Sequence, residues 1–284
     1  MATFATSEQL LVIIDPVARQ ADGESVRIAK DVLSAGAAAK VCLPEGPEEF
    51  ARALGRRGSR RPVVVGDDRA LVRAVTLLHR HRELAGCALS VVPVGEAGLA
   101  RSLGVPSGAV AAARAVLDGA ERRLDLLVDD SDGVVLGALG IPPVPVTARA
   151  AAVEPVSVPA GRPWLRTTYR SLVRTLAPRP ARLATVPAPG PSRLRVEVDG
   201  ETVVDLDQPV EAVSVTPGAG GVAEVEVRPL SLGAEATPLR ARGRTVTVVG
   251  GDFRYRADAA VSGPVRRRTW RVVEGAWGLT LPSA

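Results

Sequence analysis

The feature that most constrains this 284-residue chain is a change in the spacing of its apolar residues near residue 131. Before that point, short apolar runs alternate with segments whose apolar residues recur every three or four positions. This order of strands and helices is typical of a parallel sheet buried between layers of helices. Beyond residue 193 the apolar residues recur at every second position, as in antiparallel strands with one buried face.

Five apolar runs in the first half have the length and composition of buried strands. They cover residues 10–14, 40–43, 62–65, 88–92 and 124–128. The intervening segments have helical spacing, and the segment after residue 68 brings four apolar residues onto one face: Leu71, Ala74, Val75 and Leu78. We therefore expect an α/β domain of nucleotide-binding type, with a parallel sheet, over residues 1–130.

The second half has the pattern of an all-β domain. Apolar and charged side chains alternate strictly over residues 194–199, and Asp199-Gly200 supplies a hairpin turn signal. Similar alternation recurs at residues 222–227, 245–249 and 269–273. We expect an antiparallel β-sandwich over residues 131–277.

Two segments between the halves have a different character. Residues 142–163 are rich in proline and alanine and are expected to form a linker or an extended strap. Residues 164–176 have the apolar spacing of a helix. The acidic run 129–132 lacks the ligand spacing of an EF-hand, so we expect a solvated loop there.

Composition and charge bound the possible functions. The net charge of +5 is compatible with a nucleotide, a nucleic acid or an acidic lipid surface as partner. The basic residues are dispersed and aromatic residues make up only 3% of the chain, which argues against nucleic acid. The N-terminus has no signal-peptide pattern and no apolar stretch reaches the length of a membrane span, so we expect a cytoplasmic protein.

Three loops of the first half are candidates for a binding site. Ligands of open α/β sheets bind outside the carboxyl ends of the strands. In this chain those ends lead into the loop at Asp15 and into residues 66–69 and 93–98. The acidic pair Asp67-Asp68 has two interpretations there, since it could hold a metal or cap the helix that follows.

The motifs in the first two loops resemble those of the diacylglycerol kinase catalytic family, which includes bacterial lipid kinases and sphingosine kinases. The first strand of the family ends in Asn-Pro, and here it ends in Asp15-Pro16. The diagnostic loop of the family, Gly-Gly-Asp-Gly-Thr, aligns with Gly66-Asp67-Asp68-Arg69-Ala70. The chain thus keeps the first glycine and the aspartate, and replaces two glycines and the threonine.

Two later motifs extend the resemblance over essentially the whole chain. The Pro-x-Gly-Thr motif of the family appears as Pro93-Val94-Gly95-Glu96, and the asparagine that follows in the family is absent. The Asp-Gly-Glu motif appears as Asp258-Ala259-Ala260, about two dozen residues before a final Leu-x-Pro-like Leu281-Pro282. The resemblance implies that a strand near 278–282 returns to complete the first domain.

The resemblance also implies an activity and a site. A member of the family transfers phosphate from ATP to a lipid hydroxyl with the help of Mg²⁺. The implied nucleotide-binding residues are Asp15, Gly66, Asp67, Asp68, Arg69, Gly95 and Glu96. Asp68 would hold Mg²⁺, and Asp258 would be the general base. Asp258 also has the alternative interpretation of a turn residue.

The leading hypothesis is therefore a kinase of a lipid or another hydroxyl-bearing small molecule, with possible transient contact with a membrane surface. The alternative is a pseudokinase that binds a lipid or nucleotide without chemistry, and a third hypothesis is a structural module. Four carboxylates and one clearly placed cation, Arg69, would face the triphosphate, so we expect weak ATP binding that depends strictly on Mg²⁺ or Mn²⁺. The sequence does not determine an oligomeric state.

Overall fold

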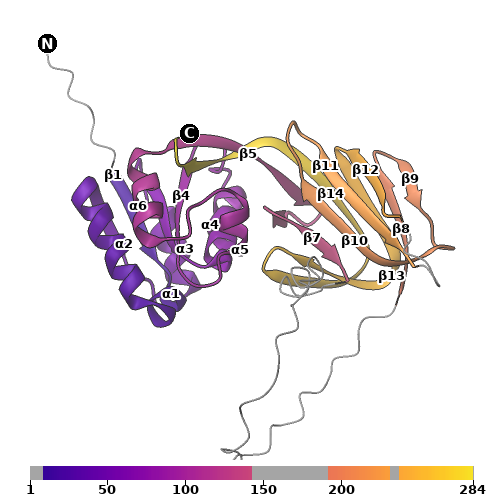
Figure 1. The fold of residues 1–284 in the computed structure, drawn as a ribbon, viewed down its shortest axis with the longest axis horizontal. Coiled ribbons are helices and arrows are strands. Elements are labelled where there is room, and N and C mark those ends of the chain that lie inside the picture. The colour runs from indigo at the N-terminus through magenta and orange to yellow at the C-terminus, as the bar shows by residue number, and fades with distance from the viewer. Residues whose placement is uncertain (1–8, 143–190, 231–236, 284) are drawn as a thin grey trace, which may run out of the picture. The chain divides into compact units, whose positions relative to one another are not determined.

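The computed structural model describes residues 9–142, 191–230 and 237–283 (Figure 1). These residues form mixed α/β structure with many antiparallel strands, which confirms the predicted fold class at that level. The predicted helix over 164–176 and all but the first residue of the predicted linker lie outside the described residues. No helix within the described ranges is both long enough and apolar enough to cross a membrane.

Helices, singly or in pairs, alternate with strands as far as residue 129, and two short strands follow (Figure 1). In chain order they are β1 (Gln9–Ile14), α1 (Pro16–Ala21), α2 (Gly23–Gly36), β2 (Ala38–Cys42), α3 (Pro47–Gly55), β3 (Arg61–Gly66), α4 (Asp68–Arg80), β4 (Ala88–Pro93), α5 (Gly98–Ser102), α6 (Ala109–Asp118), β5 (Ala120–Asp129), β6 (Val134–Val135) and β7 (Leu139–Ile141). The strands β4, β3, β1 and β2 lie side by side in that order and pair in parallel. Their carboxyl ends therefore share one edge of the sheet.

Alternate side chains of β1 enter two different cores. Leu11 and Ile13 pack with apolar residues of α3 and α4, while Leu10 and Val12 pack with apolar residues of α2 and α6. Successive side chains of a strand point to opposite faces, so helices must cover both faces of this sheet. This two-sided burial explains why β1 is a continuous apolar run in the sequence.

The fifth predicted strand does not continue the parallel sheet. β5 runs antiparallel to β14 (Ala260–Leu281), from the pair Ala120–Leu281 to the pair Asp129–Trp270. The same end of β14 pairs in parallel with β4 through Gly278 and Leu279. β14 therefore occupies the position beside β4 that the local pattern would give to β5. The division into domains at residue 130 stays a prediction.

Antiparallel strands make up the second half. They are β8 (Ser192–Val198), β9 (Glu201–Val204), β10 (Pro209–Pro217), β11 (Ala223–Pro229), β12 (Leu239–Gly243), β13 (Thr245–Ala257) and β14. Their buried side chains alternate with more exposed ones, as the period of two predicts. The core of this half includes Tyr255 and Trp270, whose rings pack edge to face at 5.2 Å between centroids. The sandwich arrangement of these strands stays a prediction.

Candidate functional site

The carboxyl ends of β1, β3 and β4 bring the three predicted loops together. The amide of Val94 donates to the carbonyl of Gly66 at 2.9 Å, which joins the ends of β4 and β3. A Cβ placed on Gly66 would lie 3.1 Å from the Cβ of Asp15 at the end of β1. A Cβ on Gly95 would lie 3.7 Å from the Cβ of Asp67. The predicted loop residues are therefore neighbours in space.

Gly66 is required by close packing. A Cβ at this position would approach the Cβ of Ala70 to 2.7 Å, a distance that real Cβ contacts essentially never show. Ala70 lies in the first turn of α4, so a glycine at the end of β3 lets this helix start against the strand. Packing is thus a sufficient reason for this glycine, whatever its role toward a ligand.

Gly95 and Glu96 form the turn after β4. Gly95 has a φ of +93°, a conformation that glycine adopts without steric cost. The carbonyl of Glu96 accepts the amide of Asp68 at 2.9 Å, while the Glu96 side chain is exposed. Arg69 is also exposed, and its side chain makes no hydrogen bond or ion pair with another described residue. These two side chains are available to a ligand.

Asp67 caps α4. Its Oδ1 accepts the amide of Ala70 at 2.9 Å, and its backbone is extended at φ −83° and ψ −179°. Aspartate is favoured at this position because it satisfies an unpaired amide and complements the positive end of the helix. The capping interpretation that the sequence left open is therefore realised for Asp67.

Asp68 caps a different helix from the one that it begins. Its Oδ2 accepts the amide of Leu99 at 2.8 Å, and its Oδ1 accepts the amide of Ala100 at 3.0 Å. Both amides belong to the first turn of α5. The adjacent acids at 67 and 68 therefore serve the starts of two helices, which no spacing rule for a single helix predicts.

Asp15 is buried and ion-paired. Its side chain is 2% exposed; Oδ1 accepts the amide of Val17 as the cap of α1, and Oδ2 accepts from Arg73 at 2.7 Å. The Arg73 guanidinium also lies 5.5 Å from the ring centroid of Phe50. Sequence reasoning missed Arg73 and placed only Arg69. The one feature of the sequence that could have indicated Arg73 is its position one helical turn after Arg69, on the helix that follows the diagnostic loop.

Asp258 lies in the two-residue turn between β13 and β14, with a φ of +47°. Its Oδ2 accepts the amide of Leu136 at 2.7 Å, and its Oδ1 accepts the amides of Gly137 and Ala138 at 2.8 and 3.0 Å. The carboxylate thus fixes the link between β6 and β7. Asp258 is a turn residue, as one interpretation proposed, and its role as a general base stays a prediction.

The pKa of the Asp258 carboxyl is shifted mainly by burial, with a smaller effect of Asp68 in the second loop. Burial raises the pKa of Asp258 above its ordinary value; the three amide hydrogen bonds oppose this shift and the negative charge of Asp68 adds to it. A Cβ on Gly137 would lie 2.4 Å from Cδ1 of Leu99 and 3.2 Å from Oδ1 of Asp258. The turn at Asp258 and the start of α5 are therefore in close proximity.

The sequence led us to expect a solvated loop at the acidic run 129–132. In the structure this run is only partly solvated. Asp129 is buried, and its Oδ1 accepts bonds from the amide and hydroxyl of Ser131 and from the amide of Gly133. Burial alone would raise the pKa of Asp129, but these hydrogen bonds together hold the pKa below its ordinary value. Among the described residues, no group of three His, Cys, Asp or Glu side chains is placed to hold a metal ion.

Among known proteins, this chain is similar to solved structures, and comparison of its sequence finds no match. No family model and no curated protein matches this sequence. Two solved structures from Bacillus anthracis str. Sterne, each named as a candidate diacylglycerol kinase, superpose with TM-scores of 0.69 and 0.70 at 14% and 13% identity. A third, named among the diacylglycerol kinases of the same organism, gives 0.68 at 13% identity. The superpositions cover 97–99% of this chain and 97–98% of the others.

The chain has a diacylglycerol kinase fold. Because the match covers nearly the full length of both chains, the resemblance found in the sequence is borne out at the level of structure. Identity of 13–14% extends this likeness to the fold and no further. The candidate site must therefore be judged from the side chains that this chain places on the diacylglycerol kinase fold.

Proposed function

We propose that this chain is a non-catalytic protein on the diacylglycerol kinase fold, a pseudokinase that binds a hydroxyl-bearing lipid without phosphorylating it. The observation that carries the proposal is the carboxylate of Asp67, which occupies the N-terminus of α4. The N-terminus of a helix is a ready anion site, and here the protein supplies the anion itself.

The nucleotide side of the site does not fit a triphosphate. Asp67 and Asp68 direct their carboxylates at the starts of α4 and α5, and the exposed Glu96 adds a third negative charge. Asp15 is neutralised by Arg73, which leaves Arg69 as the described loop cation without a partner. Phosphate oxygens a few ångströms from these acids would be repelled, and the repulsion is strong in a partly desolvated site. We therefore derive no phosphoryl-transfer step.

The Asp258 carboxylate is suited to bind a ligand hydroxyl. Three backbone amides hold the Asp258 carboxylate in place, two of them on Oδ1 and one on Oδ2. A carboxylate oxygen can accept two hydrogen bonds, so Oδ2 retains the capacity to accept one from a ligand hydroxyl. The structural neighbours are named after diacylglycerol, a lipid with one free hydroxyl group, and this is the ligand class that we propose.

Thermal stabilisation tests the proposal. Dioctanoylglycerol should raise the melting temperature of the full chain, whereas trioctanoylglycerol, which lacks the hydroxyl, should not. The Asp258→Asn variant should lose the effect, and the matched control Asp252→Asn, which alters an exposed carboxylate on β13, should keep it. ATP or ADP with Mg²⁺ should give no shift. Equal shifts of the melting temperature with both lipids would refute the ligand assignment. So would an Asp258→Asn variant that keeps the shift.

A second candidate, an active lipid kinase, is favoured by the raised pKa of Asp258, since a general base works best with a pKa closer to the operating pH. Multiple-turnover transfer of labelled phosphate from ATP to dioctanoylglycerol would establish this candidate and exclude the pseudokinase. In that case Asp258→Asn should lower turnover by orders of magnitude while ATP binding stays intact. A fully active Asp258→Asn enzyme would remove this residue from the mechanism.

A further inference from the structure

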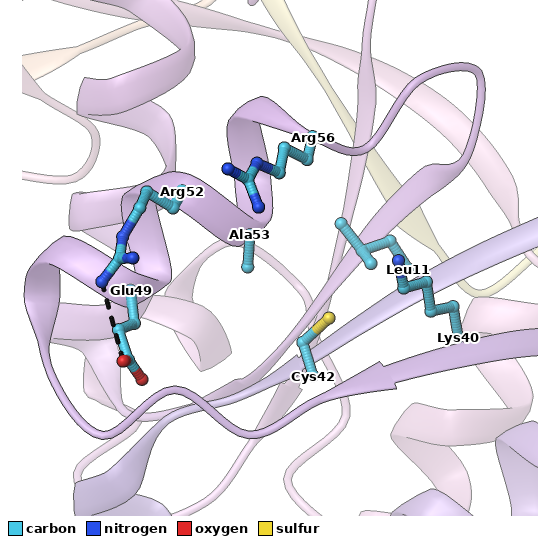
Figure 2. A pocket seen from close by; sticks show the side chains of 7 residues that line it. All are labelled: Leu11, Lys40, Cys42, Glu49, Arg52, Ala53 and Arg56. Carbon is cyan, nitrogen blue, oxygen red and sulfur yellow. Dashed lines mark ion pairs between the residues drawn. The ribbon is translucent and has the colours of Figure 1, made fainter.

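A basic hollow of about 250 Å³ lies between the edge strand β2 and helix α3. Figure 2 shows Lys40 and Cys42 of β2 on one side of it, and on the other side Glu49 and Arg52 of α3 and Arg56, the residue that follows α3. Among the described strands, β2 pairs only with β1, so this hollow opens at an edge of the sheet. The hollow is a separate site, because none of the residues predicted for nucleotide or catalysis lines it.

The floor of the hollow is apolar. Leu11, only 1% exposed, and Ala53 lie at its base, and the thiol of Cys42 points toward them (Figure 2). Lys40 and Cys42 are two positions apart in β2, so their side chains share the face that meets α3. A ligand here would contact apolar groups as well as charges.

The rim of the hollow is positively charged. Arg52 lies on α3, and Arg56 caps its C-terminal end one turn later, where its amide donates to the carbonyl of Arg52, so both guanidinium groups can reach one ligand. Arg52 has a loose ion pair of 3.6 Å with Glu49, whose carboxylate also accepts the amide of Glu45. Lys40 and Arg56 have no ion pair with another described residue. Three cations and one carboxylate thus leave an excess of two positive charges.

We propose that this hollow binds a phosphomonoester group. A phosphomonoester carries close to two negative charges at neutral pH and three acceptor oxygens, which match the excess charge and the donors of the rim. Arginine and lysine together are the side chains that bind phosphate most often, through forked and point-charge contacts respectively. The free volume suits a small head group with a short carbon chain on the apolar floor. This inference is independent of the function proposed above.

Cys42 supplies a direct readout. It lines the hollow and is partly exposed, whereas Cys87, the other cysteine of the chain, is 6% exposed. N-ethylmaleimide should therefore modify Cys42 first, and glycerol 3-phosphate should slow this reaction in the wild-type chain. Glycerol and acetate at equal concentration should not slow it. Equal protection by glycerol, or unchanged labelling with glycerol 3-phosphate and with vesicles of phosphatidic acid alike, would overturn the proposal.

Charge variants separate recognition from general attraction. Arg56→Gln and Lys40→Gln should each weaken the protection by about tenfold, because each removes a charge-assisted contact. Arg114→Gln is the matched control, since Arg114 is an exposed cation on α6 outside the hollow. Equal affinity in all three variants would show that only the net charge of the chain attracts the ester. Binding should also weaken as the pH falls below about 6, where the second phosphate proton returns.

Two further arms identify the source of the ester. If glycerol 3-phosphate protects Cys42 and vesicles of phosphatidic acid in phosphatidylcholine do not, the ligand of the hollow is a free metabolite. If these vesicles protect Cys42 and vesicles of pure phosphatidylcholine do not, the ligand of the hollow is a lipid head group. Absence of protection in both arms contradicts the proposal.

Discussion

The Nη1 atom of Arg73 lies 2.7 Å from Oδ2 of Asp15, a carboxylate that is only 2% exposed. This ion pair joins the start of α1, at the end of β1, to the second turn of α4. It also changes the charge of the candidate site, since Asp15 cannot be counted among the acids that repel a ligand.

Replacing Arg73 should destabilise the chain because it would leave a buried carboxylate without its counter-charge. We expect Arg73→Met to lower the free energy of unfolding by about 2–3 kcal/mol, at the low end for a buried pair since Arg73 is itself one-third exposed. Urea denaturation measures this change. Asp15→Asn should be less harmful in the Arg73→Met background than in the wild type; additive effects would show that the pair is not coupled.

Asp67 offers a test of the charge at the start of α4. Asparagine caps helices about as well as aspartate, so Asp67→Asn should keep the stability and remove the charge, whereas Asp67→Ala should cost about 1 kcal/mol. We expect Asp67→Asn and Asp67→Gly to gain measurable binding of ATP with Mg²⁺ in calorimetric titration. Tight binding of ATP to the wild-type chain without metal would show that the charge argument is wrong.

The raised pKa of Asp258 predicts a pH dependence of stability. A carboxyl whose pKa is higher in the folded state stabilises the fold at low pH, and this contribution is lost as the pH rises from about 4 through the raised value. The difference in unfolding free energy between the wild type and Asp258→Asn should therefore shrink as the pH rises. Urea denaturation at intervals between pH 3 and pH 8 gives this difference directly.

Asp129 provides the matched control for that measurement, because its pKa is shifted in the opposite direction. A lowered pKa stabilises the fold above about pH 4, and this contribution is lost as the pH falls through the lowered value. The difference between the wild type and Asp129→Asn should accordingly grow as the pH rises through that range. If both differences in unfolding free energy change with pH in the same direction, the pKa shift of one of the two groups has been assigned the wrong sign.

Gly66 should tolerate no side chain. We expect Gly66→Ala to lower the free energy of unfolding by about 1–3 kcal/mol, since its Cβ would collide with Ala70. Adding Ala70→Gly should recover part of the loss despite the lower helix propensity of glycine. Gly55→Ala, where a Cβ would meet no atom within 4 Å, should be neutral. A neutral Gly66→Ala would instead mean that α4 can move away from β3.

The part of the fold that could be predicted consists of strands whose burial determines the local spacing of apolar residues. β1, β3 and β4 are buried and mostly apolar after their first residue because helices cover both faces, and β8 and β11 alternate because one face is buried. The neighbour of β5 could not be predicted from such patterns, because β14 reaches that position from the other end of the chain. Only the resemblance to a family indicated a returning strand.

The positions of the candidate site residues were predictable, and their bonding was not. The rule that ligand sites lie at the carboxyl ends of parallel strands selected the loops that the structure brings together. It could not show that Asp68 caps α5 rather than α4, or that Arg73 neutralises Asp15. Both contacts depend on how helices pack across the sheet, which sequence spacing within one helix does not encode.

The position of β14 has a consequence for synthesis on the ribosome. Trp277, Leu279 and Leu281 are buried in the same core as side chains of β1, α3 and α4. A nascent chain that has already made β1 to β4 still lacks these side chains, and Ala88 and Leu89 at the start of β4 stay without their partners Gly278 and Leu279 until these emerge. The core of the first half is thus complete only after the second half has been translated, so we expect nascent chains that lack β14 to depend on chaperones.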